Sequence, residues 1–350
     1  MSQRMEAPGL TACDLLFITA SLLSYLLIAL SHAAFAVHLL LHNAWLHLLI
    51  FSLVLLIASL LGNGVSYLME PEGLWAHALQ LSLPARALRL LRHRATYAQL
   101  EARKALVKLA CLQLLTHALP VLSAAFLALL RAFHLSSAMD AAFAAVFLLH
   151  GAWLLGPLSK DVLRCRTSSA ILSWPGILGQ MSWRLGTLSG RLALLGAYAA
   201  ALPLPCALLS SLHCLLCAAA FLLLFPPPKK AWSVKRVLVL LGLSCCSLLD
   251  FVADPLEESG LSSMQQLLSY YFLLLAEATF IMAHLWLVHA PHLVVLSVLV
   301  VSAETWGLLS CLVYHGCLHP KRMMASKTYS LAQRCYAHQQ NFTTSQQYLL

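Results

Sequence analysis

The stretch SWPGILGQMSWRLGTLSGRLALLGAYAAAL, residues Ser173–Leu202, carries two arginines inside an apolar run that is long enough to cross a bilayer. Arg184 and Arg191 are seven residues apart, so on a helix they would share one face, about two turns from each other. A charge near the middle of a bilayer costs between about 2.5 and 17 kcal/mol. The segment therefore predicts a polar interior, an acidic partner or lipid headgroups around the two guanidinium groups. The same run contains five glycines, whose lack of a side chain lets another helix backbone come close: Gly176, Gly179, Gly186, Gly190 and Gly196.

The composition around this stretch is that of an integral membrane protein. Of the 350 residues, 61% are hydrophobic and 10% are charged, and the mean hydropathy is +0.80, whereas about 25% of the residues of a soluble domain are charged. The pattern predicts an all-α polytopic membrane protein with one membrane domain, residues 1–315, and a polar, basic C-terminal tail, residues 316–350. The net charge of +9 follows the bias of cytoplasmic loops that face anionic lipid. Nucleic-acid binding is excluded because the basic residues are dispersed between apolar runs instead of lining one face.

Apolar runs of helical length follow each other along the chain. The first two, Cys13–Leu41 and Trp45–Leu68, are joined by a short polar turn and must form an antiparallel hairpin. The fourth run, Ala138–Leu158, is expected to be closed by Pro157, before a basic loop, SKDVLRCR. The remaining runs are Ala105–Leu130, Cys206–Phe225, Val237–Leu249, Leu267–Val288 and Leu293–Tyr314.

With Ser173–Leu202 these runs give nine crossings, or about eight if one of them is re-entrant. Placing PPPKKAWSVKR on the cytoplasmic side, with every later run crossing, puts the basic tail outside, against the positive-inside rule. One resolution is that Ser173–Leu202 enters and returns, or kinks within the bilayer, which requires protein or water around its backbone.

The segment 70–104 differs from the apolar runs. It has a basic excess, which places it on the cytoplasmic side, and its stretch Leu74–Leu91 is amphipathic and interrupted by Pro84. Such a segment lies on the membrane surface or dips part-way into it.

Charged and polar residues inside the apolar runs form the candidate site. Paired across a cleft, they would define a hydrophilic lipid or ion path; the alternative is a buried ion pair that only fixes the packing of the helices. Lys108 is close enough to a membrane end to extend to it, while Gln113 and His117 share a face and would equally serve interhelical hydrogen bonds. The candidates are Arg184, Arg191, Glu277, His284, Glu304, Gln113, His117 and Lys108.

No enzyme signature is present, so we expect no covalent catalysis, no cofactor and no metal. The sequence lacks HExxH, GxSxG, a Walker A loop and a DHHC-type cysteine cluster. Cys214 and Cys217 form a CxxC motif, but without a second ligand pair a buried helical pair is the favoured interpretation. Single histidines such as His150 are expected to be packing residues.

Three segments carry a resemblance to a known family. WPGILGQMSWRLGTLSGRLALL (Trp174–Leu195) resembles the W…Q-x-x-W-R-x-G-x-L-x-x-R-x-L run of the XK-related membrane proteins. VYHGCLHPKR (Val313–Arg322) is similar to that family's Y-x-x-L-HP near the last span, and HALQLSLPARALRLLRH (His77–His93) fits the position of its leucine-rich helix. Among the branches of the family, that of the fifth member looks most similar.

The resemblance implies about eight spans and two partly inserted segments. Several members are phospholipid scramblases that expose phosphatidylserine at the plasma membrane of dying cells, and others act as membrane partners of lipid-transfer proteins. The resemblance thus implies a lipid-handling protein of the plasma membrane, with a cytoplasmic tail and with phospholipids as partners. The alternative is a non-transporting scaffold for a lipid-transfer protein or a single-span chaperone subunit. A solute transporter is less favoured because there is no clear internal repeat.

The chain also departs from the family. Leu22–Leu41 lacks the acidic residues that scrambling members carry in the first span, and Lys108–Leu122 lacks the glutamates of their third span. The tail contains no aspartate, so it cannot be cut at a caspase site like the tails of the caspase-activated members.

Overall fold

The computed structural model describes residues 12–69, 84–85, 88, 118–130, 137–166, 174–224, 244, 247–249, 263–289 and 293–318. Apart from short turns, these residues are helical, and none of them lies in a strand. The all-α prediction is therefore confirmed. Most of the amphipathic segment 70–104, the tail beyond Leu318 and three candidate residues lie outside the described part of the chain (Lys108, Gln113 and His117).

The first two helices form the expected antiparallel hairpin. Helix α1 spans Ala12–Leu41 and packs against α2, Trp45–Met69. In the turn between them Asn43 has a φ of 54°, a left-handed conformation that asparagine tolerates better than most residues. The amide of Asn43 donates to the carbonyl of Leu40 at 3.0 Å, which closes the turn.

Helix α7, Ala138–Arg166, is longer than the sequence suggested. The prediction that it ends at Pro157 is wrong, because the helix continues through the basic SKDVLRCR segment. Proline removes a single hydrogen bond of the ladder, and the turn before it is held against the central helix α8: a Cβ on Gly156 would lie 3.6 Å from Met181 Cγ. At the start of α7, Ser137 and Asp140 cap each other's backbone amides at 3.0 and 3.1 Å, an arrangement like a capping box.

Helix α8, Trp174–Ala201, lies at the centre of the bundle and contacts α6, α7, α9, α11 and α12. It is one continuous helix of 28 residues, so the prediction that this segment enters and returns is wrong. Pro175 stands in the first turn, where a missing N–H leaves no bond unmade. The glycines accommodate neighbouring helices instead of breaking α8.

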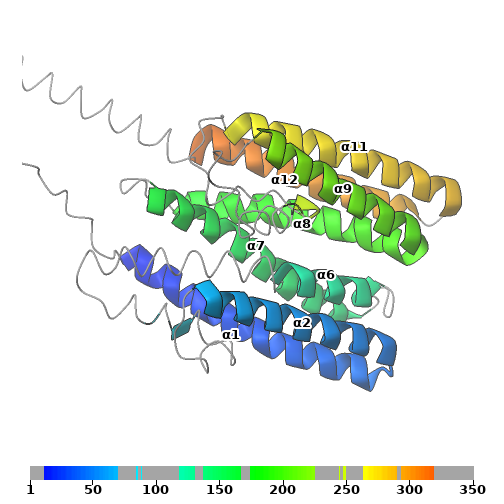
Figure 1. Cartoon of the computed structure of the whole chain (residues 1–350), viewed down its shortest axis with the longest axis horizontal. Coiled ribbons are helices and arrows are strands. Elements are labelled where there is room, and N and C mark those ends of the chain that lie inside the picture. The colour runs from blue at the N-terminus through cyan, green and yellow to red at the C-terminus, as the bar shows by residue number, and fades with distance from the viewer. Residues whose placement is uncertain are drawn as a thin grey trace, which may run out of the picture.

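The remaining helices lie on both sides of α8. Figure 1 shows α1 and α2 on one side and α9, α11 and α12 on the other, with α6, α7 and α8 between them. Their bounds are Leu119–Ala128 for α6, Pro203–Leu224 for α9, Ser263–His289 for α11 and Leu293–Val313 for α12, which a π-helical turn, Tyr314–Leu318, continues.

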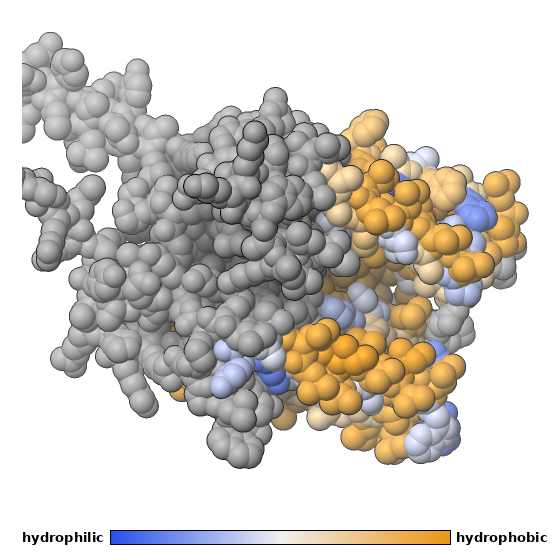
Figure 2. Space-filling view, in the orientation of Figure 1, coloured by the Kyte–Doolittle hydropathy of each residue, from blue (hydrophilic) through white to orange (hydrophobic). Residues whose placement is uncertain are grey.

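The outer surface of the bundle is suited to lipid. Leu287 is 86% exposed and Phe272 76%, and apolar side chains make up most of the coloured part of the face that Figure 2 shows. Among the described residues, five helical stretches are long and apolar enough to cross a membrane: Ile18–Leu41, Trp45–Gly64, Ala138–Gly156, Tyr270–Val288 and Val294–Leu318. The chain is an integral membrane protein.

Candidate functional site

One face of α8 is polar and buried. Gln180, Arg184, Thr187 and Arg191 follow each other at intervals of four, three and four residues, which places them along one helical face. Arg184 is 4% exposed and Arg191 is 0% exposed, so neither side chain extends to the surface of the protein. We call these four residues the polar stripe of α8.

Arg191 is held in a three-helix cluster with Glu277 of α11 and His213 of α9. The Arg191 Nη2 donates to Glu277 Oε2 at 2.7 Å, and His213 Nδ1 lies 2.5 Å from Glu277 Oε1. The carboxylate therefore bridges the guanidinium and the imidazole, with one oxygen for each. We call Arg191, His213 and Glu277 the charged cluster.

Residues 247–249 close the charged cluster on a further side. The Arg191 Nε donates to the carbonyl oxygen of Leu248 at 3.1 Å, and the other ring nitrogen of His213 lies 3.1 Å from Ser247 Oγ. The Tyr270 hydroxyl donates to the carbonyl of Ser247 at 2.6 Å. Four separate parts of the chain thus meet around one ion pair, because each of them supplies a bond that a charged group in an apolar interior requires.

Arg184 occupies a different, aromatic environment. Its guanidinium carbon lies 4.0 Å from the ring centroid of Trp183. The Trp183 indole donates to the Tyr271 hydroxyl and stacks on Tyr314 at 6.2 Å between ring centroids. A cation over an indole face is stabilised by the ring quadrupole, so the two arginines of α8 are accommodated in two different ways.

The other two predicted side chains on α11 and α12 also contact α8. A Cβ on Gly190 would lie 2.9 Å from Glu304 Oε1, so the carboxylate of Glu304 lies directly against the α8 backbone, one residue before Arg191. His284 Nδ1 lies 2.8 Å from the hydroxyl of Tyr198. Both acidic residues, Glu277 and Glu304, therefore face the helix that carries the two arginines.

A known protein family matches the part of the chain that contains these residues. The model of the XK-related protein family covers residues 16–320, most of the chain and all of the polar stripe. The chain belongs to the XK-related family. A comparison with curated proteins gives no match.

In this XK-related protein the sequence pointed to Arg191 and Glu277, which are in contact, but not to His213. The histidines are scattered singly along the chain, and the partners of His213 lie 64 and 34 residues away. The only local signal was its place four residues before Cys217, whose Sγ lies 3.4 Å from His213 Nε2.

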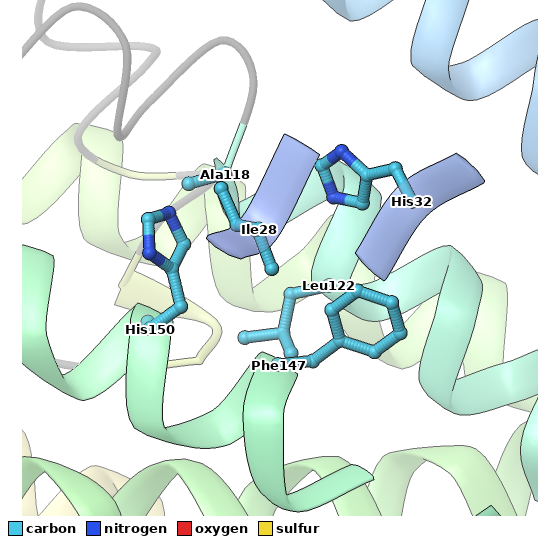
Figure 3. Close-up of a pocket in the computed structure, with 7 residues that line it drawn as sticks. Ile28, His32, Ala118, Leu122, Phe147 and His150 are labelled. Atoms are coloured by element: carbon cyan, nitrogen blue, oxygen red, sulfur yellow. The ribbon is translucent and has the colours of Figure 1, made fainter. Parts of the chain in front are cut away.

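A second polar seam of the XK-related bundle joins α1 to α7. Its three contacts are Trp153 Nε1 to Ser21 Oγ at 3.3 Å, Ser24 Oγ to His150 Nδ1 at 2.8 Å, and His38 Nε2 to Asp140 Oδ1 at 2.9 Å. Beside this seam is a small, partly open pocket, which His32 and His150 flank in Figure 3. The other lining residues are Ile28, Ala118, Leu122, Phe147 and Gly151.

Proposed function

We propose that this XK-related protein handles phospholipids and lets their headgroups pass between the two leaflets without covalent chemistry. The observation that carries the proposal is the polar stripe of α8, which places two guanidinium groups and two hydrogen-bonding side chains in the middle of a membrane helix bundle. Membership of the XK-related family supports the same class of function.

The physical argument concerns the hydration of the headgroup. A phospholipid headgroup carries charges that lose their water when they enter the hydrocarbon layer, at a cost of several kcal/mol or more. The two guanidinium groups of α8, with the carboxylates that face them from α11 and α12, can replace part of that hydration. Since α11 and α12 cover the stripe and Glu277 pairs with Arg191, we assign the arrangement described here to a closed state. Passage of a headgroup would require α8 and α11 to separate at the charged cluster.

Reconstitution tests this proposal. Purified full-length protein is placed in liposomes that contain fluorescently labelled phosphatidylserine or phosphatidylcholine, and a membrane-impermeant quencher reports which molecules reach the outer leaflet. We expect exchange with the wild type and a changed rate with Glu277→Gln. The matched control is Thr279→Ala, two residues along α11, where the hydroxyl is exposed and bonds only the Leu275 carbonyl of its own helix, at 2.8 Å. Wild-type liposomes that exchange no more lipid than empty ones, with folded protein confirmed, would refute the proposal.

The proposal extends to location. We place the protein in the plasma membrane with its basic tail in the cytoplasm, where phosphatidylserine is the anionic lipid to be exposed. Because the tail has no aspartate, we do not expect caspase cleavage to activate the exchange.

A second function is favoured by the burial of Arg191. A guanidinium that is 0% exposed and bonded to Glu277 and Leu248 can serve purely to fix helix positions. In that case the protein is a membrane scaffold for a lipid-transfer protein or a single-span chaperone subunit. Normal partner recovery from cells that express an Arg184→Ala, Arg191→Ala double variant, together with no exchange by the wild type, would favour the scaffold.

A further inference from the structure

The groups around His213 offer an oxygen acceptor to each ring nitrogen. The Ser247 hydroxyl donates its single hydrogen to the carbonyl of Ser244 at 2.6 Å, so its oxygen faces His213 Nε2 as an acceptor. The carboxylate oxygen of Glu277 also accepts, from His213 Nδ1. With these two acceptors satisfied, both ring nitrogens carry hydrogen, which makes the ring an imidazolium.

We infer that His213 is a buried proton-binding site and that its charged ring ties α9 to α11 and to residues 247–249. Neither the lipid proposal nor the family match assigns a role to this residue, and the inference does not depend on either of them. The ligand of the site is a proton, and the site consists of the oxygen acceptors at both ends of one imidazole.

The site can also accommodate the ring after the proton has left. A neutral ring that keeps hydrogen on Nδ1 still donates to Glu277, while Nε2 becomes an acceptor. The Ser247 hydroxyl and the Cys217 thiol, at 3.1 and 3.4 Å from Nε2, can each turn a hydrogen toward it. If Ser247 does so, it gives up its bond to the Ser244 carbonyl. Loss of the proton therefore replaces the bond between the Ser247 hydroxyl and the Ser244 carbonyl by a bond from that hydroxyl to the ring.

The groups that face His213 make this exchange sensitive to pH. Glu277 of α11 is the facing carboxylate, and Arg191 of α8 competes for it from the other side. Ser247 faces the ring from residues 247–249, and Cys217 faces it from α9 itself. With the proton bound, the ring donates to Glu277 at one nitrogen and to Ser247 at the other, while Arg191 holds the second oxygen of the same carboxylate. The charged ring makes these two bonds only while the proton is bound, so the stability they add is present in acid and is lost as the pH rises.

The test uses the full-length protein in lipid nanodiscs, labelled with ¹⁵N in the histidine side chains. The signals of His213 are assigned by their loss in His213→Gln, and Tm is measured from pH 6 to pH 9. We expect both ring nitrogens to carry hydrogen at pH 6 and Tm to fall as the pH rises. This pH response should shrink in His213→Gln and persist in the control His284→Gln, whose ring faces the Tyr198 hydroxyl.

A second variant keeps the histidine and removes one acceptor. In Ser247→Ala the charged ring loses the oxygen at Nε2, so we expect the titration midpoint of His213 to move toward acid by about one pH unit, which corresponds to about 1.4 kcal/mol. Three results would overturn the inference: a ring that is neutral at pH 6, a pH response of Tm that is equal in the wild type and His213→Gln, or a midpoint that is unchanged or moves toward alkali in Ser247→Ala.

Discussion

A close approach between α8 and α12 predicts a large effect of a single methyl group. Gly186 of α8 faces Gly307 of α12, and a Cβ added at Gly186 would lie 2.6 Å from both the Cα and the amide nitrogen of Gly307 and 2.8 Å from the carbonyl oxygen of Ala303. All three are backbone atoms, so no flexible side chain can give way. Because non-bonded carbons prefer about 3.5–4.0 Å, α8 and α12 would have to separate by about 1 Å in Gly186→Ala.

That separation has a cost that can be worked out from the neighbouring contacts. Overpacking of a filled interior costs about 1–3 kcal/mol, and a backbone obstacle places Gly186→Ala toward the upper end. The shift would also stretch the two hydrogen bonds between α8 and α12 at Ser182, which are 3.0 Å to the hydroxyl of Ser310 and 2.9 Å from the indole of Trp306. We expect Tm to fall by about 5 °C or more.

The assay is thermal unfolding of the full-length protein in detergent, read as the loss of the monodisperse peak in size-exclusion chromatography. Gly64→Ala on α2 is the matched control, because a Cβ there meets no atom within 4 Å and alanine favours the helix. The reciprocal change Gly307→Ala should behave like Gly186→Ala, since its Cβ would lie 2.9 Å from the amide nitrogen of Thr187. Equal Tm values for Gly186→Ala and Gly64→Ala would refute the close α8–α12 contact.

Three further predictions concern the charged cluster, α7 and the tail. Arg191→Met removes one of the two partners of the buried Glu277 carboxylate while His213 remains, so the protein should lose up to about 3–5 kcal/mol of stability, the upper value being that of a fully unpaired charge, and adding Glu277→Met should recover part of it; a double variant less stable than the single one would contradict this. Asp140→Ala removes the cap that Asp140 shares with Ser137 and also its contact with His38, and should cost about 1 kcal/mol or more in thermal unfolding, whereas an unchanged Tm would show that neither contact contributes. If the tail is cytoplasmic, the sequon Asn341-Phe-Thr343 stays unmodified, so treatment with a glycosidase should leave the mobility of protein from mammalian cells unchanged, and a shift would place the tail outside.

The hairpin and the helix bounds show what apolar length can predict. The runs Cys13–Leu41 and Trp45–Leu68 differ from α1 and α2 by one residue at single ends, because a long apolar run next to a short polar turn leaves one possible arrangement. The end of α7 could not be predicted in the same way. Pro157 has a local effect that favours a helix end, and the contact of Gly156 with α8 that opposes it involves residues far along the chain.

The charged cluster could likewise be predicted only in part from the sequence. Charge balance alone indicated that Arg191 needs an acidic partner, and few acidic residues lie inside the apolar runs, so Glu277 could be proposed. His213 could not be proposed, since a histidine in an apolar helix gives no sign of what faces it. Its role depends on Glu277 and Ser247, which reach it from other parts of the chain.

The α1–α7 seam and the polar stripe of α8 bury different kinds of group, and this difference bears on the route that a lipid headgroup would take. The α1–α7 seam consists of hydroxyls, an indole and histidines. Its one carboxylate, Asp140, lies at the start of α7, where it also bonds the backbone amide of Ser137. The polar stripe of α8 and the charged cluster instead contain charged groups of both signs in the interior, at Arg184, Arg191 and Glu277. Neutral hydroxyls replace little of the hydration of a phosphate, whereas guanidinium groups bind it with charge-assisted hydrogen bonds. Among the described residues, the charges that could replace the hydration of a headgroup lie on α8 and on the helices that face it, so the path proposed above would depend on α8 and would open by breaking the bond between Arg191 and Glu277.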